Sequence, residues 1–199
     1  MNKINIKKLT LTAIFVAISV VGSIFSFPVF GSKCAPVQHM VNVFCAIFLG
    51  PWYGLVQAFL SSLIRNLLGL GTLLAFPGSM CGALLSGVLY AIISKKHLVL
   101  KRIMAYAGEI IGTGVIGGML AFPIAALIMG NAQAGLFTFV IPFLISTVGG
   151  TIIAIVVVEI MAGTGILKWL KGQLEGSNGK QKIHDTDGRS PKGDCNEGN

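Results

Sequence analysis

The stretch from Cys34 to Ser94 places the tightest limit on how this chain can fold, because Arg65 is its only charged side chain. A run of that length with so little charge cannot cover the surface of a water-soluble domain, so the sequence predicts a protein embedded in a lipid bilayer. Two segments containing Gly and Pro interrupt the run, at residues 50–54 and 75–80. Each sets an aromatic side chain beside a proline that disrupts helix, so both are expected to break helices.

The overall composition supports a membrane protein. Of 199 residues, 54% are hydrophobic and 11% are charged, whereas soluble domains carry about 25% charged residues. We predict one membrane domain over residues 1–172 and a polar, disordered cytoplasmic tail over residues 173–199. The net charge of +8 comes mostly from Lys and Arg at the ends of apolar runs. It therefore indicates contact with the cytoplasm and anionic headgroups rather than with nucleic acid.

Three basic clusters set the predicted number of crossings: residues 3–8, 95–102 and 168–192. If all three face the cytoplasm, an even number of crossings separates each pair. The fold class that follows is an all-α integral membrane protein with six transmembrane helices and both termini cytoplasmic. The predicted spans are residues 9–30, about 38–49, two more up to Ser94 that are bounded by the breaks at 50–54 and 69–79, then 103–129 and 136–162.

Several other classes of protein find no support in the sequence. Residues 9–30 are longer than the apolar core of a signal peptide, about 7 to 15 residues, so we interpret them as a first transmembrane helix. The four cysteines have no CxxC spacing, and we predict neither a metal site nor a cofactor. Hydrolase motifs and the Walker A motif are absent. We therefore expect no enzymatic activity, and uphill transport would draw its energy from a partner or an ion gradient.

Polar side chains inside the apolar runs are the candidate binding residues. Gln38, His39 and Asn42 open the predicted second helix, and their spacing places Gln38 and His39 on the same face as Asn42. They either hydrogen-bond a small polar ligand beneath the outer surface or cap the helix, and the sequence favours neither. Arg65 and Asn66 close the third helix. Arg65 either pairs with an anion, reaches toward headgroups or braces the segment at residues 68–79, and bracing is slightly favoured.

Two carboxylates, Glu109 and Glu159, are predicted near the cytoplasmic ends of the fifth and sixth helices. By helical rise they lie roughly 10 Å or more below Arg65, so a direct ion pair with it is not expected. An intramembrane carboxylate also suits a proton relay. Because Lys and Arg side chains lie close by in the sequence, we favour ion pairs or a partner contact for both.

Ala13 and Ala17 form a small-xxx-small pair on the first predicted helix, which allows another helix to approach closely. Comparable pairs recur along the chain, at 82/86, 108/112, 114/118 and 121/125. Packing inside the protein is therefore the default interpretation of such a pair taken alone.

Several linked motifs give the chain a resemblance to a known family. They are APVQHMVNV at residues 35–43, GPWY at 50–53, Arg65-Asn66, and AFPGSM at 75–80. Together they resemble ThiW, the thiazole-specific substrate-binding (S) component of energy-coupling-factor vitamin transporters, over about residues 5–170.

The resemblance implies a six-helix protein of the cell membrane that captures hydroxyethylthiazole, a thiamine precursor, from outside. It implies as partners a transmembrane coupling protein, which Ala13 and Ala17 would contact, and two cytoplasmic ATPases. Thiamine or another vitamin is the alternative ligand, and an autonomous proton-coupled secondary transporter is the alternative class. The candidate substrate-binding residues are Gln38, His39, Asn42, Arg65, Asn66, Phe76, which would supply an aromatic wall, and Ser79.

Overall fold

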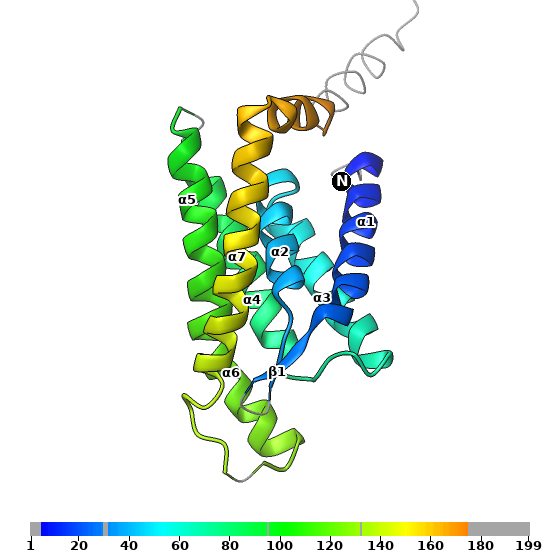
Figure 1. The fold of residues 1–199 in the computed structure, drawn as a ribbon, viewed down its shortest axis with the longest axis vertical. Helices are drawn as coiled ribbons and strands as arrows, with labels where there is room; N and C mark the ends of the chain where they lie inside the picture. The colour runs from blue at the N-terminus through cyan, green and yellow to red at the C-terminus, as the bar shows by residue number, and fades with distance from the viewer. Residues whose placement is uncertain (1–4, 30–31, 95, 132, 175–199) are drawn as a thin grey trace, which may run out of the picture.

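The computed structural model describes residues 5–29, 32–94, 96–131 and 133–174, which form an upright bundle of helices (Figure 1). The described helices are α1 (Ile6–Gly22), the short η1 (Ser23–Phe25), α2 (Pro36–Phe48), α3 (Pro51–Leu67), α4 (Ala75–Ile92), a continuous rod made of α5 (Leu98–Glu109), the π-helical η2 (Ile110–Gly117), α6 (Gly118–Pro123) and the π-helical η3 (Ile124–Ile128), and then α7 (Val140–Gly163). Residues 166–174 form a last helix that crosses the end of the bundle where α1 begins. The predicted tail lies outside the described residues from residue 175 onward.

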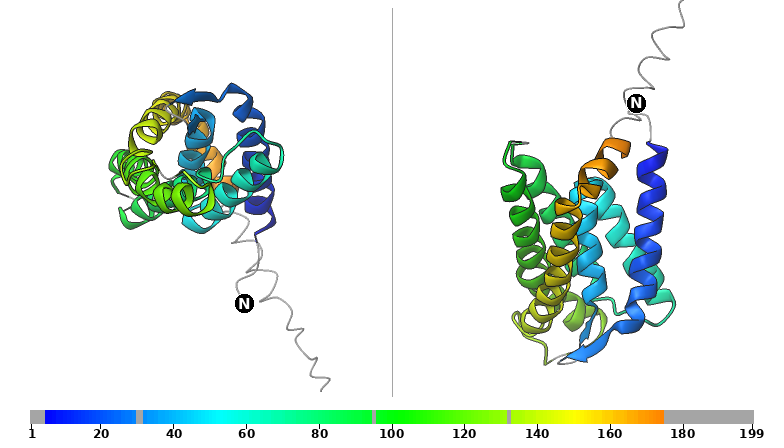
Figure 2. Two further views of the ribbon diagram at one scale, coloured as in Figure 1. Left: turned by 90° about the horizontal axis from the view of Figure 1, so that it is seen from below. Right: turned by 45° about the horizontal axis from the view of Figure 1, so that its top comes forward.

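Helix α2 is the central element of the bundle. It contacts α1, α3, α4, α5 and α7, and Figure 2 shows the other helices arranged around it. A helix enclosed on all sides buries residues around its whole circumference rather than along one stripe. Accordingly, α2 buries apolar residues such as Val41 and Val43 and also the polar residues Gln38, His39 and Asn42.

Four helical segments of the described chain are long and apolar enough to cross a membrane: Ile6–Phe25, Ala75–Ile92, Leu98–Ile128 and Val140–Gly163. Helices α2 and α3 have 13 and 17 residues and are shorter than the roughly 20 residues that span a bilayer upright. The protein is therefore a helical, multi-pass membrane protein. Six crossings with both termini on one side stay a prediction.

The first predicted helix is shorter than expected, which corrects the prediction of residues 9–30 as one helix. After η1 the chain forms β1 (Phe27–Val29), which pairs antiparallel with β2 (Ser32–Cys34), placing Phe27 opposite Cys34. Pro28 explains the change, because proline cannot donate a helical hydrogen bond and biases the residue before it toward extended backbone. A small β-hairpin thus interrupts an otherwise all-α fold.

The two Gly/Pro breaks are real but narrower than predicted. At the first, Gly50 alone makes the turn with φ of 89°, and Pro51 is already the first residue of α3. At the second, the non-helical segment is residues 68–74, and α4 begins at Ala75 with Pro77 in its first turn. Proline is tolerated there because the first backbone N–H groups of a helix have no acceptor within it.

Close packing between α2 and α7 depends on one glycine. A Cβ atom at Gly150 would lie 2.2 Å from the carbonyl oxygen of Pro36 and 2.7 Å from the Cβ of His39. At the preceding residue, Gly149, the nearest atoms would be 4.0 Å away, in the side chain of Pro36. The two glycines are chemically identical neighbours, and only Gly150 sets the distance between the helices.

We predict that Gly150→Ala lowers the unfolding temperature of the detergent-solubilised protein, because overpacking at this contact costs about 1–3 kcal/mol. Gly149→Ala is the matched control and should match or slightly exceed the wild type, since Ala is the better helix former. Thermal unfolding followed by circular dichroism measures both. Equal unfolding temperatures for the two variants would show that α2 and α7 do not pack as described.

Candidate binding site

A small cavity lies between the helices in the half of the bundle away from the N-terminus. Its volume is about 30 Å³, which is room for about two water molecules. Charged, polar and aromatic side chains from both halves of the sequence meet around it. The lining residues are Lys33, Ala35, Gln38, His39, Arg65, Thr72, Ala75, Gly78, Ser79, Thr113, Phe143 and Ser146.

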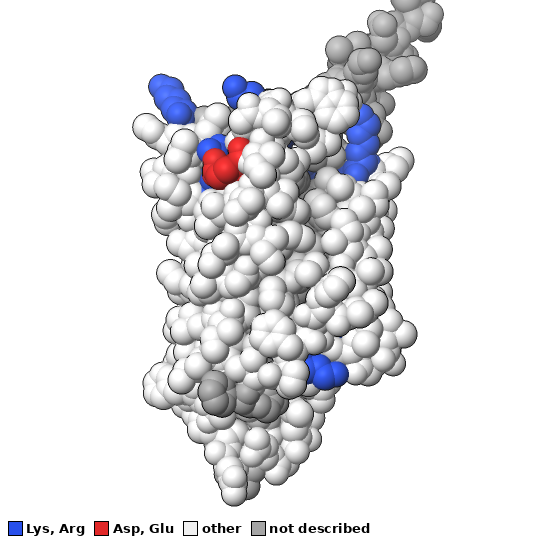
Figure 3. Space-filling view, in the orientation of Figure 1, with Lys and Arg blue, Asp and Glu red and all other residues white. Residues whose placement is uncertain are grey.

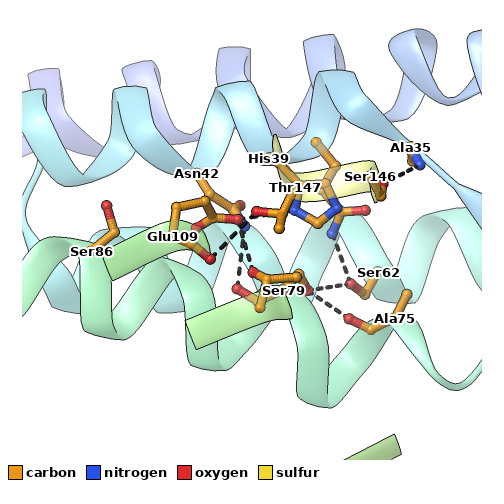
Figure 4. A network of polar contacts seen from close by, with 12 residues as sticks. Ala35, His39, Asn42, Ser62, Ala75, Ser79, Ser86, Glu109, Ser146 and Thr147 are labelled. Atoms are coloured by element: carbon orange, nitrogen blue, oxygen red, sulfur yellow. Dashed lines mark hydrogen bonds and ion pairs between the residues drawn. The ribbon is translucent and has the colours of Figure 1, made fainter. Parts of the chain in front are cut away.

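The carboxylate of Glu109 is the hub of the polar contacts beside this cavity (Figure 4). Its Oε1 atom accepts hydrogen bonds from Asn42 Nδ2 at 3.0 Å and Thr113 Oγ1 at 2.9 Å, and it lies 2.9 Å from His39 Nδ1. The side chain is fully buried. Burial of a carboxylate is costly unless donors compensate it, and these three groups compensate Oε1. The other oxygen, Oε2, is buried without a hydrogen-bond partner in the described chain.

The same contacts orient the imidazole of His39. Because Glu109 Oε1 already accepts from Asn42 and Thr113, we assign the proton between the two side chains to His39 Nδ1. The other ring nitrogen, Nε2, then remains available, and His39 lines the cavity. Glu109 therefore orients His39 from outside the cavity lining, and His39 is the residue of the pair that can contact a ligand in the cavity.

A second chain of hydrogen bonds runs along the cavity between α2, α3 and α4. Gln38 Nε2 donates to Ser62 Oγ at 3.2 Å, and the hydroxyls of Ser62 and Ser79 are 2.9 Å apart. Ser79 Oγ also lies 2.8 Å from the carbonyl oxygen of Ala75, to which it can donate. On the opposite side, the hydroxyl of Ser146 accepts from the backbone N–H of Ala35 at 2.9 Å, tying α7 to the residue before α2.

Four of the seven predicted substrate-binding residues line the cavity: Gln38, His39, Arg65 and Ser79. Asn42 lies one layer beneath, where its amide donates to Glu109 and to the Ser79 carbonyl at 3.3 Å. The other two are placed elsewhere. Asn66 donates to carbonyls of Ser62 and Thr72, and Phe76 packs against Phe59 with ring centroids 5.7 Å apart.

The predicted start of the helix that contains Glu109 was wrong, whereas the absence of a direct ion pair between Glu109 and Arg65 agrees with the contacts of the described residues. The rod that carries it begins at Leu98 rather than at residue 103, so Glu109 lies roughly 16 Å along the helix, at the level of His39 and Asn42. The error came from starting the helix after the last basic residue. The spacing of Glu109 and Thr113, four residues apart beside the small residues Gly108 and Gly112, was the available signal for an inward-facing carboxylate.

Glu159 has the ion pair that was expected of it. Its carboxylate accepts from Arg102 Nε and Nη2, both at 2.9 Å, and from the Tyr106 hydroxyl at 3.3 Å. The side chain of Glu159 is 45% exposed. The two carboxylates of the described chain therefore differ in kind: Glu159 is at the surface, whereas Glu109 is enclosed by the site.

Ala13 and Ala17 lie on the exposed face of α1. The residues next to them, Ile14 and Ile18, are 48% and 42% exposed. This pair therefore does not pack inside the described part of the chain, contrary to the default interpretation of such a motif.

We predict that Glu109→Ala destabilises the protein by about 3–5 kcal/mol, because it leaves buried donors of α2 and η2 without their acceptor. Glu159→Ala is the control and should cost about 0–1 kcal/mol, since its ion pair is partly exposed. Thermal unfolding of both purified variants tests this. A loss at Glu159 as large as that at Glu109 would contradict the proposed hub.

Comparison with known proteins adds one positive finding. The profile of a family described as thiamine-precursor transporter protein (ThiW) matches residues 9–164. No curated protein and no solved structure matches the chain. The matched region includes every helix from α2 to α7, all the residues that line the cavity, and the buried Glu109. The chain therefore belongs to the ThiW family of thiamine-precursor transporter proteins.

Proposed function

We propose that this chain is the substrate-binding (S) component of an energy-coupling-factor transporter and that it takes up hydroxyethylthiazole from outside the cell. In this proposal the protein captures the ligand and releases it after docking on a transmembrane coupling protein driven by two cytoplasmic ATPases. The chain itself performs no chemistry. The observation that carries the proposal is the polar cavity enclosed by α2, α3, α4 and α7 in a chain of this family.

The cavity lining supports a small heteroaromatic ligand with a hydroxyl group. His39 Nε2, the Gln38 amide and the Ser79 hydroxyl offer donors and acceptors, and Phe143 offers an aromatic wall. Ligand pockets commonly combine apolar and aromatic walls with a few convergent polar groups of this kind. A ring requires more space than two water molecules. We therefore expect the cavity to widen when the ligand binds.

The distribution of charge supports an outward-facing cavity. Lys and Arg atoms gather at the end of the bundle where α1 begins (Figure 3), and cytoplasmic ends of membrane proteins are enriched in these residues. The cavity lies in the other half, beside the hairpin and residues 68–74. This distribution supports an N-terminus in the cytoplasm and a site that opens to the outside.

The exposed face of α1 supports a partner contact. Ala13 and Ala17 leave a shallow strip along an otherwise bulky surface that includes Ile14 and Ile18. Small residues of this kind let a second membrane helix approach closely and gain packing contacts. We propose that this strip receives the coupling protein.

The buried pair of His39 and Glu109 favours one rival, an autonomous proton-coupled secondary transporter. A carboxylate inside the membrane beside an imidazole is a recurring arrangement in proton relays. Glu159, the other carboxylate considered for this role, is occupied by Arg102. Uptake that continues without the ATPases but stops when the proton gradient is dissipated would favour this rival.

We predict that His39→Ala and Asn42→Ala each weaken ligand binding by about 1–3 kcal/mol, or roughly 5- to 150-fold in Kd. His39 loses a direct contact, and Asn42 loses the amide that holds Glu109 and the Ser79 carbonyl in place. Calorimetry with hydroxyethylthiazole measures the affinity. Gln57→Ala is the control, because Gln57 is a buried amide that binds Ser61 and does not line the cavity. Unchanged affinity in both test variants would remove α2 from the site.

We predict that replacing Ala13 and Ala17 together with Trp abolishes uptake in cells and leaves ligand affinity within about twofold of wild type, since the strip is remote from the cavity. Ala91→Trp, at another exposed alanine near the end of α4, should support normal uptake. Radiolabelled uptake and calorimetry give the two readouts. Loss of binding in the double variant would show that the strip serves the fold instead.

A further inference from the structure

Arg65 is a buried cation for which the described chain supplies no partner. The residue is 2% exposed, and its Nε atom is enclosed without a hydrogen bond. No ion pair or hydrogen bond of its guanidinium occurs among the described residues. An unpaired charge in such a place costs several kcal/mol, so the position calls for a compensating group.

No carboxylate within residues 1–174 pairs with it. Glu109 and Glu159 are the only acidic residues between positions 1 and 174. Glu109 is held by His39 and its neighbours, and Glu159 is held by Arg102. Neither forms an ion pair with Arg65.

The guanidinium of Arg65 is not what braces the segment at residues 68–74. The backbone carbonyl of Arg65 accepts from the N–H groups of Leu70 at 2.8 Å and Gly71 at 3.0 Å. The amide of Asn66 donates to the Thr72 carbonyl at 3.0 Å. Backbone groups and Asn66 thus hold residues 68–74, and the guanidinium of Arg65 makes no hydrogen bond with the carbonyls of this described segment. Arg65 instead lines the cavity.

The remaining lining around Arg65 has the character of an anion site. It includes a second cation, Lys33, whose Nζ donates to the Gly69 carbonyl at 3.0 Å, and the hydroxyls of Thr72 and Ser79. None of the described residues that line the cavity carries a carboxylate. Guanidinium groups bind carboxylate and phosphate with two parallel hydrogen bonds, and burial strengthens such pairs.

We infer that Arg65 forms an oxyanion subsite and that the ligand carries a carboxylate or phosphate group which pairs with its guanidinium. This inference rests on the proposed function for the thiazole part of the ligand and concerns the substituent. In this arrangement the ring lies toward His39 and Phe143, and the anionic group lies at Arg65 and Lys33. The preferred ligand is thus an anionic derivative of hydroxyethylthiazole rather than the neutral alcohol.

The test compares neutral and anionic probes on the full chain. Calorimetry is carried out with hydroxyethylthiazole, its phosphate ester and a carboxylated thiazole, on wild type, Arg65→Gln and Arg102→Gln. We expect wild type to bind one of the anionic probes about ten- to a hundredfold more tightly than the alcohol. Arg65→Gln should lose that preference, and Arg102→Gln, whose arginine lies outside the cavity, should keep it. The two anionic probes distinguish phosphate from carboxylate.

The inference is overturned if the neutral alcohol binds wild type as tightly as both anionic probes, or if Arg65→Gln retains the anionic preference. If Arg65→Gln unfolds, Arg65→Lys is the second variant. It keeps the positive charge but loses the paired N–H donors of the guanidinium, so it should reduce the preference for the anionic probes over the alcohol. A matched alcohol and phosphate ester of a pyrimidine precursor separate this inference from the proposed function. If only the pyrimidine phosphate binds and depends on Arg65, the thiazole assignment fails and the oxyanion subsite stands. If no anionic probe binds, the subsite fails.

Discussion

The contact between Glu109 and the polar face of α2 is the interaction on which the rest of this structure depends. Burial of a carboxylate inside a membrane bundle is costly, and His39, Asn42 and Thr113 offset part of that cost through their contacts with Oε1 of Glu109. Because these donors come from α2 and η2, the contact fixes α2 against the long rod that begins at Leu98. The orientation of the His39 imidazole follows from the same contact.

The site has two layers with different physical roles. In the lower layer Asn42 and Thr113 donate to Glu109 Oε1, while Glu109 Oε2 and Asn42 Oδ1 have no hydrogen-bond partner in the described chain. In the upper layer, His39 and Arg65 line the cavity, and Arg65 Nε has no hydrogen-bond partner in the described chain. A ligand in the cavity reaches His39 and Arg65, which line it, but not Glu109 or Asn42, which do not, so it gains more binding free energy from the upper layer.

The position of the cavity and the position of the charges divide the molecule along its axis. Lys and Arg atoms gather at the end of the bundle where α1 begins (Figure 3). The partly exposed pair of Arg102 and Glu159 joins the first turns of α5 to the last turns of α7. The hairpin and the segment at residues 68–74 lie at the other end, over the cavity, and Lys33 Nζ joins them by donating to Gly69. Ligand capture at one end and partner docking along α1 are therefore separate tasks of separate surfaces in the proposed transporter.

The sequence by itself determined the membrane class, the family, most helices to within a few residues, and four of the residues that line the cavity. It could do so because hydropathy, Gly and Pro positions and short motifs are local properties of the chain. Only the tertiary structure decided that Glu109 joins α2, that Asn66 and Phe76 lie away from the cavity, and that Phe143 and Ser146 belong to it. These outcomes depend on the depth and rotation of each helix. A start five residues earlier moves a side chain by more than a helical turn, and no local pattern records which distant side chain it then meets.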